Sequence, residues 1–176
     1  MIKSVDSINI KKNKNTWYMF ALSLLILDQV TKYFVVLLLP LHGSTDVSYF
    51  FNIVHFRNEG AAFSLFADAG GWQRYFFACV ASITSLWLIF MINKSQSMRE
   101  LLGFSFVLGG ALGNLSDRLL RGNVVDFLDF YWKGSHWPAF NFADVTIICG
   151  ICLLISLIAL PNSKVVTITE YRAREQ

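Results

Sequence analysis

Asp126 and Asp144 are the residues of this chain best suited to chemistry, because each lies at the edge of a long apolar segment. Inserting a carboxylate into a bilayer costs about 2.5–3.5 kcal/mol, so such a residue usually has a partner or a function. Asp126 follows one apolar segment and Asp144 lies just inside the next, at ends that would face the same side of a membrane. The sequence therefore predicts that the two acids share one site.

Two adjacent carboxylates cannot both ionise easily, so they share a proton. One can then act as a base on water while the other, protonated, polarises a carbonyl group, which is aspartic protease chemistry and needs no cofactor. A structural interpretation fits the spacing equally well. Asp144 would be the third residue of a helix, where the dipole favours an acid by about 0.3–1 kcal/mol, and Asn141 would cap that helix.

Other polar residues interrupt the apolar segments at helical spacing. Asp28 and Lys32 are four residues apart and can pair across one turn, so a stabilising ion pair is at least as good an interpretation as catalysis. Asn114 and Arg118 have the same spacing and would face one direction. Arg118 has the planar fork needed to hold a carboxylate, a lipid phosphate or a backbone carbonyl.

Several further residues have structural interpretations. Asp117 is expected to pair with Arg121, and Asp129 to be a solvated loop charge. The glycines at 109, 110 and 113 would let neighbouring helices approach closely. The three histidines are scattered without ligand spacing, so no metal site is predicted.

Composition indicates a membrane protein. The chain has 176 residues, 55% hydrophobic and 15% charged, with a mean hydropathy of +0.48, whereas soluble domains carry about 25% charged residues. Its net charge of +3 is too small, and too concentrated at the termini, to suggest nucleic acid. We expect one membrane domain over residues 1–176, an all-α bundle of four transmembrane helices. The predicted spans are Trp17–Leu39, Gln73–Ile92, Glu100–Leu120 and Asn141–Leu160.

The distribution of Lys and Arg predicts the orientation. Nine lie in residues 1–16, 93–99 and 161–176, whereas four lie in or directly beside the longer segments 40–72 and 121–140, namely Arg57, Arg74, Arg121 and Lys133. Because basic residues favour the cytoplasmic side, we expect both termini inside and the two longer loops outside. Both Asp126 and Asp144 would then lie near the extracytoplasmic face.

The first outer loop has the composition of a small extracytoplasmic β-hairpin. Tyr49–Asn58 is rich in aromatic and β-branched residues, and Glu59-Gly60 supplies a turn before Ala61–Phe66. We expect this hairpin, Tyr49–Phe66, to rest on the membrane as a platform or lid for the site. Trp132 and Trp137 would anchor the second loop among the lipid headgroups.

Five ordered blocks closely resemble the lipoprotein signal peptidases, also called signal peptidase II. The blocks are Asp28-x-x-Thr31-Lys32, Asn58-x-Gly60-Ala61-Ala62-Phe63-Ser64, Gly109-Gly110-x-x-Gly113-Asn114-x-x-Asp117-Arg118, Gly122-x-Val124-Val125-Asp126-Phe127 and Phe140-Asn141-x-Ala143-Asp144. They spread over most of the chain and no motif position departs from the pattern.

The resemblance implies a bacterial inner-membrane aspartic endopeptidase without a cofactor. Its substrate would be a prolipoprotein whose cysteine carries a diacylglyceryl group, cut just before that cysteine, with membrane lipids around it. We expect the chain to work as a monomer. Asp126 and Asp144 match the family's catalytic pair. The residues that match its polar shell are Asp28, Lys32, Asn58, Gly60, Gly110, Asn114, Arg118 and Asn141.

Two other classes of protein remain alternatives on the residues alone. A small transporter or proton-conducting protein also uses intramembrane carboxylates, but it would place them at several depths, whereas only Asp28 and Lys32 lie deep here. A non-catalytic assembly subunit would tolerate substitution of both Asp126 and Asp144.

Overall fold

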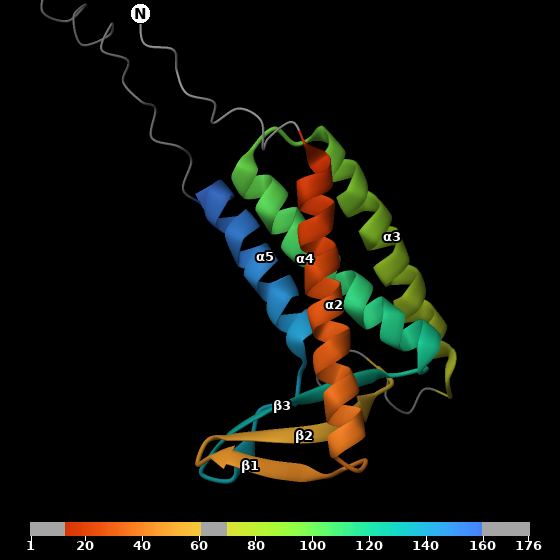
Figure 1. Ribbon diagram of the computed structural model, residues 1–176, viewed down its shortest axis with the longest axis vertical. Coiled ribbons are helices and arrows are strands. Elements are labelled where there is room, and N and C mark those ends of the chain that lie inside the picture. The colour runs from red at the N-terminus through yellow and green to blue at the C-terminus, as the bar shows by residue number, and fades with distance from the viewer. Residues whose placement is uncertain (1–12, 61–69, 160–176) are drawn as a thin grey trace, which may run out of the picture.

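Four long helices and a small antiparallel sheet make up the part of the chain that the structure, a computed structural model, describes: residues 13–60 and 70–159. The helices are α2 (Lys14–Leu38), α3 (Trp72–Lys94), α4 (Met98–Leu120) and α5 (Phe142–Ala159). They lie side by side, with the sheet at one end of the bundle (Figure 1). The ends of α2 and α4 and the start of α5 reach that sheet, and the candidate residues gather there.

The helix ends follow local chemistry. The side chain of Asn13 accepts the backbone N–H of Asn15 at the start of α2, and Ser97 accepts that of Glu100 at the start of α4. Such caps satisfy backbone donors that have no partner within the helix. Helix α2 ends at Leu38, two residues before Pro40, which is incompatible with a continuing helix.

Helix α4 is the central helix of the bundle, since it packs against α2, α3 and α5. Its glycines make this possible. A Cβ at Gly109 would lie 2.7 Å from the Cβ of Leu24 on α2, and one at Gly110 would collide with the Ala143 carbonyl oxygen on α5. Within the described residues, three helices are long and apolar enough to cross a membrane, namely α2, α3 and α5. The protein is therefore a mostly helical, multi-pass membrane protein.

The sheet contains β1 (Ser44–Ser48), β2 (Phe51–Asn58), β3 (Val124–Trp132) and β4 (Ser135–His136), in that spatial order. The predicted strand in Tyr49–Asn58 is present as β2, and its partners in the described residues are β1 and β3. A turn lies between β1 and β2, before the strand, and the other edge of β2 pairs with β3, which follows α4. The expected second strand, Ala61–Phe66, lies outside the described residues.

The pairing of β2 with β3 joins the segment between α2 and α3 to the segment between α4 and α5. Phe56 lies opposite Asp126 and Asn52 lies opposite Asp129 in this ladder. On the helix side, Val35 of α2 packs with Val125 and Phe127 of β3 in a buried cluster. The sheet is thus fixed to the bundle at the strand that carries Asp126.

Candidate active site

Asp126 is a buried residue of β3 that receives hydrogen bonds from two side-chain amides. Asn58 Nδ2, on β2, donates to Asp126 Oδ2 at 3.0 Å. Asn141 Nδ2, just before α5, donates to Asp126 Oδ1 at 2.6 Å. Both donors are neutral, so they bind the carboxyl group without supplying a counter-charge.

Asp144 is the third residue of α5, as predicted, and it forms a reciprocal cap with Asn141. The Asp144 backbone N–H donates to Asn141 Oδ1 at 3.1 Å, and the Asn141 N–H donates to Asp144 Oδ2 at 3.1 Å. This is the pattern of a capping box. The other carboxylate oxygen accepts a bond of 2.8 Å from Asn114 Nδ2 of α4.

Asn141 therefore connects the two acids. Its side-chain amide binds Asp126 while its backbone N–H binds Asp144. Its own side-chain oxygen is occupied by the Asp144 N–H, which leaves the NH2 group to face Asp126. Fully buried, Asn141 gives the site a rigid centre.

Burial and the neighbouring acid raise the pKa of Asp126 from 3.8 to about 6. Desolvation is the larger cause, and the charge of Asp144 adds to it. The hydrogen bonds from Asn141 and Asn58 and the charge of Lys32 act in the opposite direction. A carboxyl group with this pKa can hold a proton in mildly acidic water and release it near neutrality, as a catalytic acid must.

The predicted pair Asp28–Lys32 is present and fully buried, with Lys32 Nζ 2.8 Å from Asp28 Oδ2. Lys32 also donates to Asn114 Oδ1 at 3.0 Å, so it touches the residue that binds Asp144. Both members of the pair thus belong to one polar cluster with the candidate acids.

Arg118 holds backbone carbonyls, one of the three roles that its sequence position allowed. Its Nη2 donates to the Gly60 oxygen at 3.1 Å, and its Nη1 lies 3.3 Å from the Asn114 oxygen. The Gly60 N–H in turn donates to Asn58 Oδ1 at 3.0 Å, which orients the Asn58 amide toward Asp126. The shell residues Asn58, Gly60, Asn114 and Arg118 therefore form one connected set.

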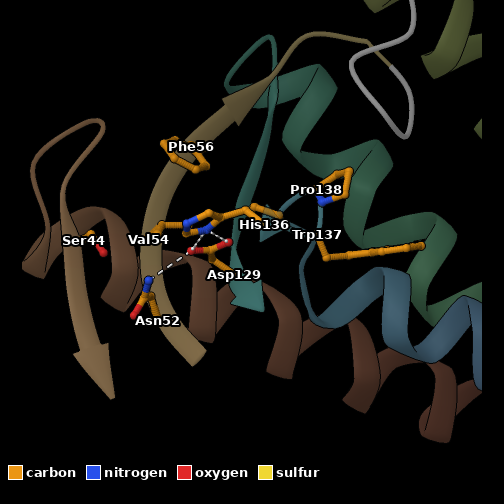
Figure 2. A pocket seen from close by; sticks show the side chains of 9 residues that line it. Ser44, Asn52, Val54, Phe56, Asp129, His136, Trp137 and Pro138 are labelled. Atoms are coloured by element: carbon orange, nitrogen blue, oxygen red, sulfur yellow. Dashed lines mark hydrogen bonds and ion pairs between the residues drawn. The ribbon is translucent and has the colours of Figure 1, made fainter. Parts of the chain in front are cut away.

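Sequence reasoning placed two acids wrongly or incompletely. Asp117 does pair with Arg121, but it is also fully buried, and its Oδ2 lies 2.8 Å from Lys32 Nζ. Asp129 is buried rather than solvated. It accepts bonds from Asn52 Nδ2 at 3.1 Å and His136 Nδ1 at 2.9 Å, beside a cavity of about 690 Å³ (Figure 2). Both acids bind residues from another part of the chain, for which local spacing gives no signal.

The chemistry that this donor set supports is acid–base attack by water. The two linked acids can divide the roles of base and acid. In residues 13–60 and 70–159, no group of three or more His, Cys, Asp or Glu side chains could hold a metal ion.

A multi-pass helical membrane protein in which Asn141 links a buried Asp126 to a half-buried Asp144 has the arrangement expected of a membrane aspartic hydrolase. Residues 5–160 match the family described as signal peptidase (SPase) II. The lipoprotein signal peptidase of Serratia marcescens is 50% identical over 129 residues, which are 73% of this chain and 76% of that protein. That of Aeromonas hydrophila is 47% identical over 142 residues, 79% and 85% of the two chains.

The fold agrees with this relationship. A solved structure described as a bacterial membrane enzyme superposes with a TM-score of 0.74 at 33% identity, over 85% of this chain and 92% of that one. The chain therefore belongs to the signal peptidase II family, and it is a peptidase that hydrolyses peptide bonds.

Proposed function

We propose that Asp126 and Asp144 are the catalytic pair of this peptidase, and that it cleaves just before a diacylglyceryl-modified cysteine. Removal of signal peptides from prolipoproteins is the activity of its family. The observation that carries the assignment of the pair is the double contact of Asn141, which binds Asp126 through its side chain and Asp144 through its backbone.

The roles of the two acids follow from their surroundings. Asp144 lies in the first turn of α5, where the helix dipole favours negative charge, so we assign it as the base that takes a proton from water. Asp126, with its raised pKa, carries the proton that polarises the scissile carbonyl. The water oxygen forms the new C–O bond, the C–N bond then breaks, and the departing amine receives the proton that Asp144 took up.

The shell would bind the substrate backbone and keep the acids in place. A peptide in a dry site loses its hydrogen bonds to water unless the protein replaces them. The polar set around the pair offers amide and guanidinium groups for this purpose. Its members are Asp28, Lys32, Asn58, Gly60, Gly110, Asn114, Arg118 and Asn141.

We also propose that α4 is a fourth span, in a single domain with the termini in the cytoplasm and the site near the outer face of the bacterial inner membrane. At 1.5 Å per residue its 23 residues cover roughly 34 Å, enough for a hydrocarbon core of about 30 Å. Its lower hydropathy is tolerable because α2, α3 and α5 surround it. The remaining contacts would be with membrane lipids, and we expect a monomer.

Cleavage of a purified, diacylglyceryl-modified precursor tests the proposal. Wild-type protein in detergent should release the signal peptide, whereas Asp126→Asn and Asp144→Asn should stay folded and inactive, because each keeps its shape but loses its acid–base group. Unmodified precursor is the substrate control and should be cut much more slowly. Near-normal cleavage by either variant would refute the catalytic pair, and equal cleavage of both precursors would refute the lipid requirement.

A further inference from the structure

The buried ammonium group of Lys32 is the meeting point of three acceptors. Its Nζ lies 2.8 Å from Asp28 Oδ2, 2.8 Å from Asp117 Oδ2 and 3.0 Å from Asn114 Oδ1. An ammonium group has three N–H donors, so each donor has one acceptor here. These acceptors lie on α2 and α4, and Lys32 is fully buried between them.

The two carboxylates of this cluster hold the backbone just before the two candidate catalytic acids. Asp117 Oδ2 accepts the N–H of Val125, the residue before Asp126, at 3.2 Å. Asp28 Oδ1 accepts the N–H of Ala143, the residue before Asp144, at 2.9 Å. One hydrogen bond thus fixes the start of β3, and the other the start of α5.

The third acceptor leads to Asp144 directly. Because the Lys32 ammonium occupies Asn114 Oδ1, the NH2 group of that amide must face the other way, where Nδ2 donates to Asp144 Oδ1 at 2.8 Å. Rotating the amide would bring its NH2 group against the ammonium and its oxygen against the Asp144 carboxylate, and both contacts are repulsive. Lys32 therefore ensures that the NH2 group of the Asn114 amide, and not its oxygen, faces Asp144.

We propose that Lys32 is a positioning residue for hydrolysis, and that it holds the segments carrying Asp126 and Asp144 in register through Asp117, Asp28 and Asn114. The proposal rests on the assignment of the catalytic pair above. It assigns Asp117 a role in positioning the site, beyond the pairing with Arg121 that its spacing suggests.

Charge balance explains how such a cluster can exist in a dry interior. Asp28 and Asp117 are matched by Lys32 and by Arg121, which pairs with Asp117 and donates to Gln29 Oε1 at 3.0 Å. Buried charges persist when they are paired and hydrogen-bonded. The fit is close, because a Cβ at Gly113 would lie 2.6 Å from Asp28 Oδ2.

A purely stabilising ion pair and a positioning cluster make different predictions. A stabilising pair affects how much protein folds and leaves the folded enzyme unchanged. A positioning cluster affects the turnover of the folded enzyme, because a displacement of about 1 Å at the reacting groups can lower the rate ~100-fold.

The test compares three full-length variants with a matched control, using diacylglyceryl-modified precursor in detergent. Lys32→Met removes the centre of the cluster. The charge-balanced Lys32→Met/Asp28→Asn variant removes one cation and one anion, so that folding is kept, and its new amide side chain retains an oxygen for the Ala143 N–H. Asp117→Asn likewise retains an oxygen for the Val125 N–H. The control is Asp129→Asn, which alters an equally buried acid on β3 that has no contact with this cluster in the described residues.

We expect both Lys32 variants to lower kcat ~100-fold or more, measured on folded protein, with KM changed less than about threefold. The double variant should unfold at a higher temperature than Lys32→Met, without recovering kcat. Because the charge of Lys32 favours ionised Asp126, its removal should also move the falling limb of the kcat profile to higher pH. Asp129→Asn should lower the unfolding temperature and leave kcat and that limb unchanged.

A charge-balanced variant with wild-type kcat would overturn the proposal, and so would Asp117→Asn with wild-type kcat. If Lys32→Met does not fold, these two variants still decide. The catalytic pair is judged separately. Activity in Asp126→Asn or Asp144→Asn refutes the pair, whereas inactive pair variants beside a fully active charge-balanced variant refute only the positioning role.

Discussion

Asp126 and Asp129 are two buried acids of the same strand, three positions apart, with different surroundings. Each side chain belongs to a residue only 4% exposed. Asp126 receives hydrogen bonds from two neutral amides and lies near a second acid. Asp129 receives one from an amide and one from the imidazole of His136, which can carry a positive charge. The two acids are therefore equally buried, and they differ in their hydrogen-bond partners.

The comparison shows that burial of an acid does not by itself identify a catalytic group. A buried acid can be held by an amide and an imidazole, as Asp129 is by Asn52 and His136. A buried acid without a cation in direct contact has its proton held by desolvation, as the raised pKa of Asp126 shows. The cavity of about 690 Å³ adjoins Asp129 rather than the linked pair. The presence of a large cavity is therefore a poorer indicator of the reactive acid than the hydrogen bonds that each acid accepts.

The largest difference between Asp126 and Asp129 should appear when each is replaced by asparagine. We expect Asp126→Asn to lower kcat by at least about 10⁴-fold, the loss typical when one of a set of interdependent catalytic groups is removed. Asp129→Asn should leave kcat unchanged. Single-turnover cleavage of lipidated precursor, with thermal unfolding of both variants, provides the measurement. A comparable loss of kcat in the two variants would remove the distinction between the acids.

The asparagines that bind the two acids should differ in the same way in their effect on kcat. Asn141→Ala deletes the amide that binds Asp126 and weakens the cap that presents Asp144. We expect kcat to fall by about 10²–10³-fold, the usual cost of losing one preorganised donor. Asn52→Ala removes only a bond to Asp129 and should lower stability with little change in kcat. Steady-state kinetics on both variants checks this, and an inactive Asn52→Ala would place the Asp129 cluster in the reaction.

The pKa of Asp126 predicts how activity depends on pH. The proposed mechanism needs this residue protonated, and its pKa is about 6. Above that value kcat should fall by about tenfold per pH unit, because the protonated fraction falls in that proportion. A full kcat profile for wild type and for Asp129→Asn should give the same falling limb. If the falling limb moves in Asp129→Asn, it reports the titration of Asp129 rather than that of Asp126.

The raised pKa of Asp126 also predicts how the free energy of unfolding depends on pH. The folded-state pKa of Asp126, about 6, exceeds the ordinary value of 3.8, so the stabilising effect of the proton is complete below about pH 4 and is lost as pH rises to about 6. The difference corresponds to on the order of 3 kcal/mol. Thermal unfolding of wild type and Asp126→Asn at several pH values should show this component only in wild type. If the stability of wild type and Asp126→Asn depends on pH in the same way, this contribution of Asp126 is excluded.

The sequence predicted those features that depend on local spacing. The apolar segments became α2, α3, α4 and α5 within a few residues of the expected bounds. The Asp28–Lys32 contact and the cap formed by Asn141 also follow from separations of four and three residues. These interactions are set within one turn of helix, where side-chain direction is fixed by the backbone.

The features that sequence could not predict join distant segments. Asp117 meets Lys32 across two helices, and Asn52 meets Asp129 across strands from two different segments between helices. The pairing of β2 with β3 was missed for the same reason, because a turn signal after the strand gives no information about a strand in the segment between α4 and α5. Which partners each acid obtains is therefore decided by tertiary packing.

The smallest expected effect concerns His136, whose side chain is 53% exposed. His136→Ala removes one hydrogen bond to Asp129, and water can reach the vacated position from that exposed side. The loss of stability should therefore stay near about 1 kcal/mol, the typical net value of one hydrogen bond. A double-mutant cycle with Asp129→Asn, followed by chemical unfolding, measures the coupling, and kcat should remain at the wild-type level throughout. If His136→Ala instead lowers kcat while stability is kept, the imidazole acts in the reaction, and the two acids of β3 cannot be distinguished by their partners.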